Sequence, residues 1–529
     1  MMVVVDFDYS EFRKIIDLPK EKIIDGLTEI GAPTEVDPET GKLYVELTPN
    51  RPDWYSMEGL ARALRSYYKK ENRKYAVKKS DYVVNVDESV SKIRPYTACA
   101  VVKNLKFDDQ KIRDMVLLQE KLLYTLGRKV KRFGIGIYPL QAIEFPVVYT
   151  TMKPGEIIYK PLNYPKEADA NEILREHPKG QDYGHIIEKF DRYPVFVDNR
   201  KKIMALIPIV NSAETGKVDV GTKEVFIEVS GTDKLGIHHA LNIIACSFAD
   251  IGGEVYGVSV KYSKETDVCP NLEYKKMKLD VKKAGAVLGV EIGWEKIIEM
   301  LGRMGYEGQG TDILIPPYRA DVLDEIDVLE DLAIVYGYNN FEPTLPDFFS
   351  AGKRLRKYDH LDSVMREMGF VELNTFILTN KEKLERVGYS GKVKEIMNPC
   401  TGEYTSVRPT LLADMLDVFA VNKMRGLPQK FYEVGVVYEE DKTRKRLCFG
   451  LSDKKLDFST ARGYLQTMLK EMGWEYQLSE KKSGIFESPY SASVSINRTE
   501  KGVFGKVKTE ILVSYGLEFP VFICELELE

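Results

Sequence analysis

The stretch PPYRADVLDEIDVLEDLAIVYGYNN, residues 316–340, combines the period of an amphipathic helix with a surplus of acidic side chains. Its apolar residues predict a helix from about Leu323 to Tyr336 with one face toward a core. Between Ala320 and Gly352 there are eight Asp or Glu residues and no Lys or Arg. The expected core stripe is Ile326, Leu329, Leu332, Ala333 and Tyr336, and the opposite arc is Asp324, Asp327, Glu330 and Asp331.

This acidic arc needs either a partner or free access to water. Asp327 lies three and four residues before Glu330 and Asp331, and each such like-charge pair costs roughly 0.2–0.5 kcal/mol on an exposed helix. The helix dipole offsets this cost only near the first turn. Spacing alone leaves three explanations open: a solvated face, a divalent cation bound by carboxylate oxygens, or a basic partner surface.

The composition indicates a folded protein of about three or four domains, with 529 residues, 44% of them hydrophobic and 30% charged. Six cysteines without a CxxC pair and only five histidines argue against disulfides and a structural zinc site, and favour the reducing cytoplasm. Early acids and short apolar runs predict no signal peptide and no membrane span. With a net charge of −5, any RNA contact must come from local basic patches.

Several catalytic signatures are missing from the sequence. There is no GxxxxGK[ST] phosphate loop and no GxSxG nucleophile motif. The segment GIGIYP lacks the third glycine of a dinucleotide fingerprint. His238 and His239 are adjacent, whereas two zinc ligands on a helix need i, i+4 spacing, so we interpret them as part of a polar helix start.

A series of motifs, in order along the chain, resembles the β-subunit family of phenylalanyl-tRNA synthetases in its shorter archaeal form. Any one motif is weak, but the ordered series spans the chain. The motifs are NRPDWYSMEGLARAL (50–64), KVKRFGIGIYPL (129–140), QDYGHI (181–186), VNS (210–212), FIEVSGTD (226–233), the acidic stretch 316–340, NPCTGEYTSVRPTLL (398–412), FYEVGVVY (431–438) and FPVFICELEL (519–528).

The resemblance implies an α+β multidomain fold with four parts. These are a mixed α/β N-terminal domain (1–80), an α/β tRNA-editing-type domain (81–270), a small helix-rich domain with an acidic Mg²⁺-binding helix (271–346) and an antiparallel, class II synthetase-like domain without catalytic motifs (350–529). It also implies an α2β2 heterotetramer that binds the tRNA for phenylalanine. ATP is a substrate of that holoenzyme, and the aminoacyl-adenylate forms in the α subunit.

The sequence of the last domain agrees with a non-activating role. If FYEVGVVY is the class II motif, Phe431 stands where an Arg should grip ATP and Glu433 where the Glu should be. No Arg follows Arg498, although the last class II motif ends in one. Because the planar guanidinium is what binds phosphate at two points, we expect no amino-acid activation here.

An editing site has a physical rationale, since a pocket for phenylalanine cannot strongly reject tyrosine, which only adds a hydroxyl. A second pocket with a polar contact can select tyrosine and hydrolyse it from tRNA by means of a positioned water. The editing candidates are Asn211, Ser212, Glu228, Thr232 and Asp233. Simpler interpretations are a turn at Asn211–Ser212 and a helix cap at Thr232–Asp233.

Carried over position by position, the resemblance implies Mg²⁺ ligands at Asp321, Asp327, Glu330 and Asp331, with some contacts through water. For tRNA, the segment GRKVKRFG offers Arg128, Lys129, Lys131 and Arg132, although a solvated basic turn is an equal alternative. Two rival functions remain. One is a purely structural, tRNA-binding subunit with an inert editing pocket. The other is a stand-alone nucleic-acid-binding protein. The acidic run argues against this function, because its negative charge would repel phosphate.

Overall fold

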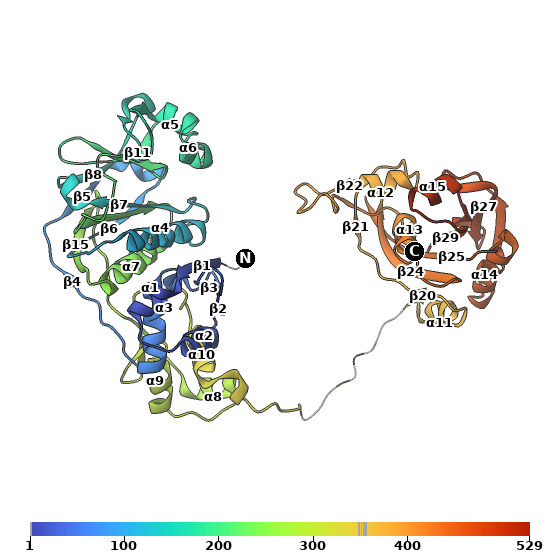
Figure 1. Ribbon diagram of the computed structural model, residues 1–529, viewed down its shortest axis with the longest axis horizontal. Coiled ribbons are helices and arrows are strands. Elements are labelled where there is room, and N and C mark those ends of the chain that lie inside the picture. Colours follow the sequence, from blue (N-terminus) through green and yellow to red (C-terminus); the bar gives the residue numbers. More distant parts are fainter. Residues whose placement is uncertain (1–2, 347–349, 351, 353–356, 529) are drawn as a thin grey trace. The chain divides into compact units, whose positions relative to one another are not determined.

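In the computed structural model, which describes residues 3–346, 350, 352 and 357–528, the chain forms two compact units (Figure 1). The first spans Met1–Leu345 and the second Pro346–Glu529. Among the described residues, no helix is both long enough and apolar enough to cross a membrane.

The first unit begins with a small antiparallel sheet in the order β1-β3-β2, covered by three helices. Asp8 caps the first helix, and Ser56 caps the third by accepting a hydrogen bond from the Gly59 amide. The elements are β1 (Val3–Asp8), β2 (Thr34–Val36), β3 (Lys42–Leu47), α1 (Tyr9–Ile15), α2 (Lys20–Glu29) and α3 (Met57–Leu64).

An eleven-stranded sheet forms the centre of this unit, with the main strand order β13-β12-β11-β8-β5-β15-β6-β14-β7. Strands β4 and β16 both pair with β15. The bounds are β4 (Val77–Lys78), β5 (Val83–Val86), β6 (Tyr96–Lys103), β7 (Phe133–Pro139), β8 (Val147–Met152), β11 (Tyr193–Val197), β12 (Ile203–Leu206), β13 (Val210–Asn211), β14 (Val225–Gly231), β15 (Glu254–Lys261) and β16 (Thr266–Cys269).

Strand β14 lies between β6 and β7, antiparallel to both, and all seven of its residues are buried. The buried helix α7 (Lys234–Asp250) packs on β6 and β14, and α4 (Asp109–Tyr124) packs beside β7 (Figure 1). A separate small core lies under β9 (Ile158–Tyr159), β10 (Ala168–Asp169), α5 (Ala170–Glu176) and α6 (Pro178–Tyr183). The sheet and its helices thus surround β14 on all sides.

The acidic stretch belongs to a third part of this unit, a sheet in the order β17-β19-β18 with three helices. Its predicted helix is confirmed as α10 (Glu325–Tyr336), capped by Asp324. Leu329, Leu332 and Ala333 are buried as expected, but Ile326 is 50% exposed because it lies in the first turn, outside the core. The other elements are β17 (Lys275–Lys278), β18 (Glu307–Gln309), β19 (Asp312–Ile315), α8 (Val281–Leu288) and α9 (Trp294–Gly302).

The second unit is a seven-stranded sheet in the order β20-β24-β25-β29-β28-β27-β26, antiparallel except for the β20–β24 pair. Separate hydrophobic cores cover its two faces, one with α11 and α14 and one with α12, α13 and α15. The bounds are β20 (Val371–Glu372), β21 (Leu378–Thr379), β22 (Lys394–Glu395), β23 (Ser406–Val407), β24 (Gln429–Glu439), β25 (Lys442–Ser452), β26 (Tyr476–Glu480), β27 (Phe486–Ile496), β28 (Thr499–Val507), β29 (Val521–Glu527), α11 (Asp359–Glu367), α12 (Lys381–Arg386), α13 (Leu412–Val421), α14 (Phe458–Glu471) and α15 (Thr509–Ser514).

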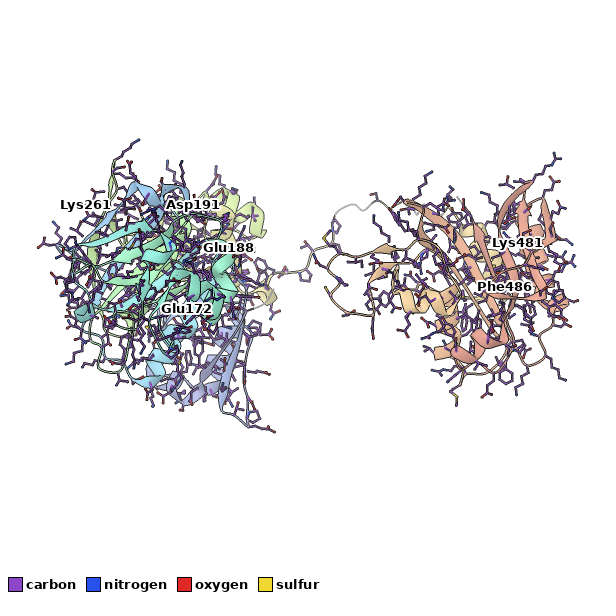
Figure 2. All side chains as sticks on the ribbon, turned by 90° about the horizontal axis from the view of Figure 1, so that it is seen from above. Glu172, Glu188, Asp191, Lys261, Lys481 and Phe486 are labelled. Carbon is purple, nitrogen blue, oxygen red and sulfur yellow. The ribbon has the colours of Figure 1, made fainter. Side chains whose placement is uncertain are left out.

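The side chains also belong to one or the other of the two compact units (Figure 2). Lys261, the last residue of β15, is exposed on the first unit, whereas Phe486, the first of β27, is buried in the second. The expected mixed α/β, multidomain architecture is therefore confirmed. The finer assignment of four domains stays a prediction.

Candidate functional site

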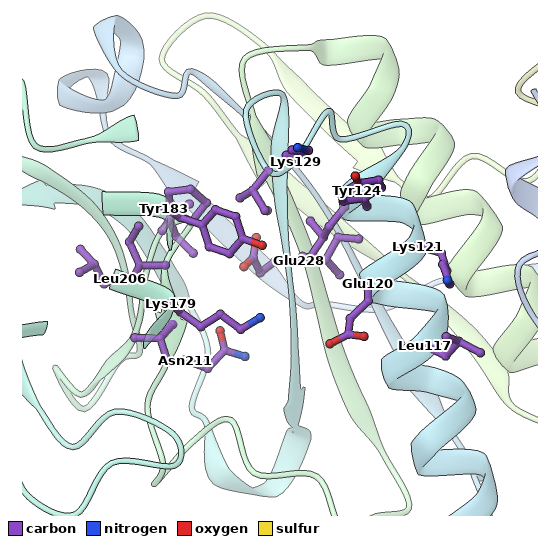
Figure 3. A pocket seen from close by; sticks show the side chains of 18 of the residues that line it. Leu117, Glu120, Lys121, Tyr124, Lys129, Lys179, Tyr183, Leu206, Asn211 and Glu228 are labelled. Carbon is purple, nitrogen blue, oxygen red and sulfur yellow. The ribbon is translucent and has the colours of Figure 1, made fainter. Parts of the chain in front are cut away.

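A pocket of about 540 Å³ opens in the first unit between α4 and the segment Leu206–Asn211. One wall comes from α4, through Leu117, Glu120 and Tyr124, and the other side carries Lys179 and Tyr183 of α6 (Figure 3). Apolar side chains dominate the rest of the lining, and they include Leu123, Val130, Ile135, Leu206, Ile207, Ile209 and Val210. The pocket can therefore hold an apolar or aromatic group.

Glu228 of β14 supplies a buried carboxyl group to this pocket. The Ser230 hydroxyl donates a hydrogen bond to its Oε2 at 2.6 Å. Burial raises the pKa of Glu228 to about 7, and the hydrogen bonds from Ser230 and Tyr138 only partly oppose this effect. At neutral pH the group is therefore divided between a carboxylate and a neutral acid, so it can either accept or donate a hydrogen bond.

Asn211 is joined to Glu228 through a tyrosine. The Tyr138 hydroxyl lies 3.3 Å from Asn211 Oδ1 and also 3.3 Å from Glu228 Oε1. Tyr138 is on β7, which pairs with β14 so that Gly136 lies directly opposite Glu228. A Cβ at Gly136 would lie 2.5 Å from Glu228 Oε1 and closer still to the Tyr138 hydroxyl. The glycine thus leaves the space in which these polar groups meet.

The structure does not bring the other three editing candidates into the pocket. Ser212 is buried on a different cavity, and its hydroxyl accepts a hydrogen bond from the Glu214 amide. The Thr232 hydroxyl is within 3.4 Å of the Arg132 carbonyl, and Asp233 caps α7 at the Gly236 amide. The simpler interpretation of Thr232–Asp233 as a helix cap agrees with this placement.

Of the four basic candidates, Lys129 lines the pocket and Arg132 is paired with Asp233 at 3.4 Å. Arg128 and Lys131 are exposed nearby. Arg128, Lys129 and Val130 have φ values of 48°, 53° and 66°, a left-handed run that β-branched residues such as Val130 rarely adopt. This unusual loop presents Lys129 at the pocket, where Lys121 and Lys179 add further positive charge.

Sequence reasoning missed Tyr138 and Ser230, as well as the walls from α4 and α6. Tyr138 lies in GIGIYP, which we tested as a nucleotide motif and included in a family motif, without assigning a role to this tyrosine. Its role depends on the register between β7 and β14, which local sequence does not determine. Ser230 gave a weak signal, because it follows Glu228 by two residues and therefore faces the same side of the strand.

The structure divides the four predicted Mg²⁺ ligands. Asp321 binds Arg319 through two hydrogen bonds of 2.8 and 2.7 Å, and Asp331 pairs with the same guanidinium at 2.7 Å. Burial opposes the ionisation of Asp321, but Arg319 and Arg51 outweigh it and lower its pKa. Asp331 also accepts a hydrogen bond from the Tyr306 hydroxyl at 2.5 Å, which explains why this acid is buried rather than on the solvated arc.

The other two acids, Asp327 and Glu330, have different surroundings. Asp327 accepts hydrogen bonds from the amides of Leu323 and Asp324, both at 2.8 Å, and so completes the helix cap. Glu330 is exposed and has no ion pair within the described part of the chain. Asp321 and Asp331 are thus held by Arg319, whereas Asp327 and Glu330 have no paired cation among the described residues, and the four-ligand site stays a prediction. Arg319 is the cation that balances Asp321 and Asp331, and it lies one residue before the acid-rich segment that starts at Ala320.

The second unit carries a buried ionic network at the expected class II motif. Glu433 accepts hydrogen bonds from Arg408 at 2.7 Å and from Thr375 at 2.5 Å. Arg408 also pairs with Asp414 at 3.2 Å. Phe431 packs against Phe419, with ring centroids 5.0 Å apart. Glu433 is thus engaged by residues of its own unit.

Two family profiles match the chain: the "tRNA synthetase B5 domain" at residues 277–338 and the "Phenylalanyl tRNA synthetase beta chain CLM domain" at residues 342–528. The phenylalanine–tRNA ligase beta subunit of Archaeoglobus fulgidus is 34% identical over 100% of this chain and 98% of its own length. That of Pyrococcus abyssi is 33% identical over 93% of this chain and 92% of its own. A solved N-terminal fragment of the phenylalanyl-tRNA synthetase beta subunit from Pyrococcus horikoshii is similar in structure. It has a TM-score of 0.61 and 33% identity, over 63% of this chain and 99% of the fragment.

Proposed function

The chain belongs to the phenylalanyl-tRNA synthetase β-subunit family, and from this membership we propose that its pocket hydrolyses tyrosine wrongly attached to the tRNA for phenylalanine. The observation that carries the proposal is the buried carboxyl group of Glu228, with a pKa of about 7, in a pocket whose walls are mostly apolar. Such a pocket accepts an aromatic ring and provides one polar group for a hydroxyl.

Selection for tyrosine follows from the cost of leaving a buried polar group without a partner. The tyrosine hydroxyl gives the buried Glu228 carboxyl group a further hydrogen-bond partner, whereas phenylalanine places only an apolar ring against it. Asn211 and Tyr138 orient this carboxyl group through the shared hydroxyl contact. The pocket therefore holds mischarged tRNA in preference to correctly charged tRNA.

Water is the attacking group in this proposal. Among the described residues that line the pocket there is no Ser, Thr, Cys or His, so no ordinary side-chain nucleophile faces the ester. Water adds to the ester carbonyl carbon, the bond to the tRNA ribose oxygen breaks, and that oxygen takes a proton. The products are free tyrosine and uncharged tRNA.

The lysines around the pocket fit the phosphates of the tRNA end. Lys121, Lys129 and Lys179 line it, and lysine contacts with phosphate give affinity without sequence preference. Arg128 and Lys131 extend this positive charge outside the pocket. Arg132 is the weakest member of the predicted set because Asp233 already neutralises it.

We further propose that the second unit does not activate phenylalanine and that the chain acts in an α2β2 assembly. Phe431 lacks the guanidinium that would bind the ATP phosphate, and Glu433 is occupied by Arg408. Adenylate formation then needs the α subunit. ATP and Mg²⁺ are used by the enzyme class as a whole.

For Mg²⁺ on this chain, we keep the predicted ligands Asp321, Asp327, Glu330 and Asp331, of which Asp327 and Glu330 are the two to test first. Neither is paired with a cation among the described residues, and Mg²⁺ keeps several waters, so two carboxylates suffice. Thermal unfolding with and without Mg²⁺ tests this assignment. We expect the ion to raise the transition temperature of the wild type and not of an Asp327→Asn, Glu330→Gln variant. An equal rise in both proteins would remove these residues from the site.

The editing proposal is tested by the hydrolysis of tyrosyl-tRNA by the assembled enzyme. Glu228→Ala should lower kcat/KM by about 10- to 100-fold, since a hydrogen bond to a charged group contributes roughly 1.5–3 kcal/mol. Asn211→Ala should lower it less, and Ser212→Ala, outside the pocket, should leave it unchanged. If Glu228→Ala hydrolyses tyrosyl-tRNA at the wild-type rate, Glu228 is not part of the site. Absence of hydrolysis by the wild-type enzyme would favour the alternative of a structural, tRNA-binding subunit with an inert pocket.

A further inference from the structure

Three potential metal ligands meet on the first unit, away from the pocket and from α10. His238 lies in the second turn of α7, and Asp267 and Cys269 lie two residues apart on β16. Alternate residues of a strand share a face, so both β16 side chains can reach α7. Among the described residues, this is the one group of three or more His, Cys, Asp or Glu side chains whose ligand atoms gather closely.

The spacing of the ligand atoms is close to what a tetrahedral zinc ion requires. His238 Nε2 is 3.1 Å from Asp267 Oδ2, and these atoms and Cys269 Sγ all lie within 4.8 Å of one another. Zinc bonds of about 2.0–2.3 Å at tetrahedral angles place neighbouring ligand atoms roughly 3.4–3.6 Å apart. Small side-chain rotations are sufficient to reach this geometry.

The donor types select the class of metal. A thiolate with an imidazole and a carboxylate suits Zn²⁺, whereas Mg²⁺ and Ca²⁺ prefer oxygen ligands only. His238 and Asp267 are about a quarter exposed (24% and 25%), so an ion can enter and a water can complete the coordination. The nearby Lys234 is paired with Glu265 at 2.8 Å, so it does not compete with His238 for the Asp267 carboxylate.

We propose that His238, Asp267 and Cys269 form a structural Zn²⁺ site that fastens β16 to α7. Strand β16 pairs only with β15 within the described sheet, and it ends at Cys269, shortly before β17 begins at Lys275. An ion at this point holds the edge of the large sheet close to the start of the region with α10. The proposal runs against the expectation, based on residue counts alone, that the chain has no structural zinc.

The chemical state of Cys269 makes the proposal testable. Cys269 is a buried, free cysteine in the absence of a metal. A bound divalent ion favours the thiolate, and the displaced proton passes to solvent. Sulfur–metal absorption therefore reports directly on ion binding at this residue.

The experiment is a Co²⁺ titration of the full chain, co-purified with its α partner and dialysed against a chelator. We expect one equivalent of Co²⁺ per chain to produce sulfur-to-cobalt charge-transfer absorption that Zn²⁺ abolishes by displacement. Cys269→Ser should remove this absorption, and His238→Asn should weaken Co²⁺ binding about tenfold or more. Two matched controls, Cys400→Ser at an exposed cysteine and His239→Asn beside the site, should behave like the wild type.

Two results would overturn the site. Absence of charge-transfer absorption in the wild type means that His238 and Asp267 form an ion pair only. Persistence of the absorption in Cys269→Ser means that Co²⁺ binds another thiol. Because Cys269 is buried and its variant could fold poorly, a second variant is Asp267→Asn, at a side chain that is about a quarter exposed (25%). Its Co²⁺ affinity should also fall about tenfold or more, and an unchanged affinity contradicts the proposal.

Discussion

A carboxyl group in a strand whose residues are all buried must either become neutral or find strong partners. Glu228 does some of both, because its pKa lies near neutrality while Ser230 and Tyr138 bond its two oxygens. Asp331 illustrates the other solution, since Arg319 and Tyr306 both bind its buried carboxyl group. The same side-chain chemistry thus serves recognition in one place and packing in the other.

The raised pKa of Glu228 predicts how stability depends on pH. The folded protein keeps this proton up to about pH 7, while the unfolded chain loses it near 4.5, so the wild type loses stability as pH rises between these values. Glu228→Gln has no such loss. Its stability relative to the wild type should increase by about 3 kcal/mol between pH 4.5 and pH 8, measured by urea unfolding. Glu273→Gln, at an exposed position, is the control and should follow the wild type. A flat difference for Glu228→Gln would show that the carboxyl group ionises normally.

At the scale of elements, the pairing of β7 with β14 builds the polar part of the pocket. Gly136 is essential to it, because any side chain there meets Glu228 and Tyr138. Gly136→Ala should therefore destabilise the first unit by about 1–3 kcal/mol and also lower tyrosyl-tRNA hydrolysis. The matched change is Gly257→Ala on β15, where the nearest neighbour of the new Cβ is 3.4 Å away. If the two variants unfold at the same urea concentration, the close contact at Gly136 does not lower the stability of the first unit.

The sequence predicted an element where the pattern that defines it lies within one short segment. Helix α10 follows from apolar periodicity, and the family motifs singled out Asn211 and Glu228. Contacts between distant segments could not be predicted in this way. Tyr138 reaches Glu228 through strand register, and residues of α4 and α6 complete the pocket through tertiary packing. The sequence placed Asp331 on the arc opposite the core but not beside Tyr306, because this partner from another element has no signature in the sequence.

At the scale of the whole molecule, the two units have separate tasks in our account. The first carries the hydrolytic pocket and the positive charge beside it, and the second has its Glu433 occupied by Arg408. The purified chain without its α partner should therefore show no phenylalanine-dependent exchange between ATP and pyrophosphate. The exchange should appear when the α subunit is added. Exchange by this chain alone would mean that the second unit activates an amino acid.

The most direct test of the central claim compares two substrates of the assembled wild-type enzyme, tyrosyl-tRNA and phenylalanyl-tRNA, both made on the tRNA for phenylalanine. Because only tyrosine brings a hydroxyl to the buried Glu228, we predict that hydrolysis of tyrosyl-tRNA is faster by about 100-fold or more, and that Glu228→Ala removes most of this preference. Equal rates for the two substrates, or a preference that survives in Glu228→Ala, would contradict the assignment of this pocket to editing.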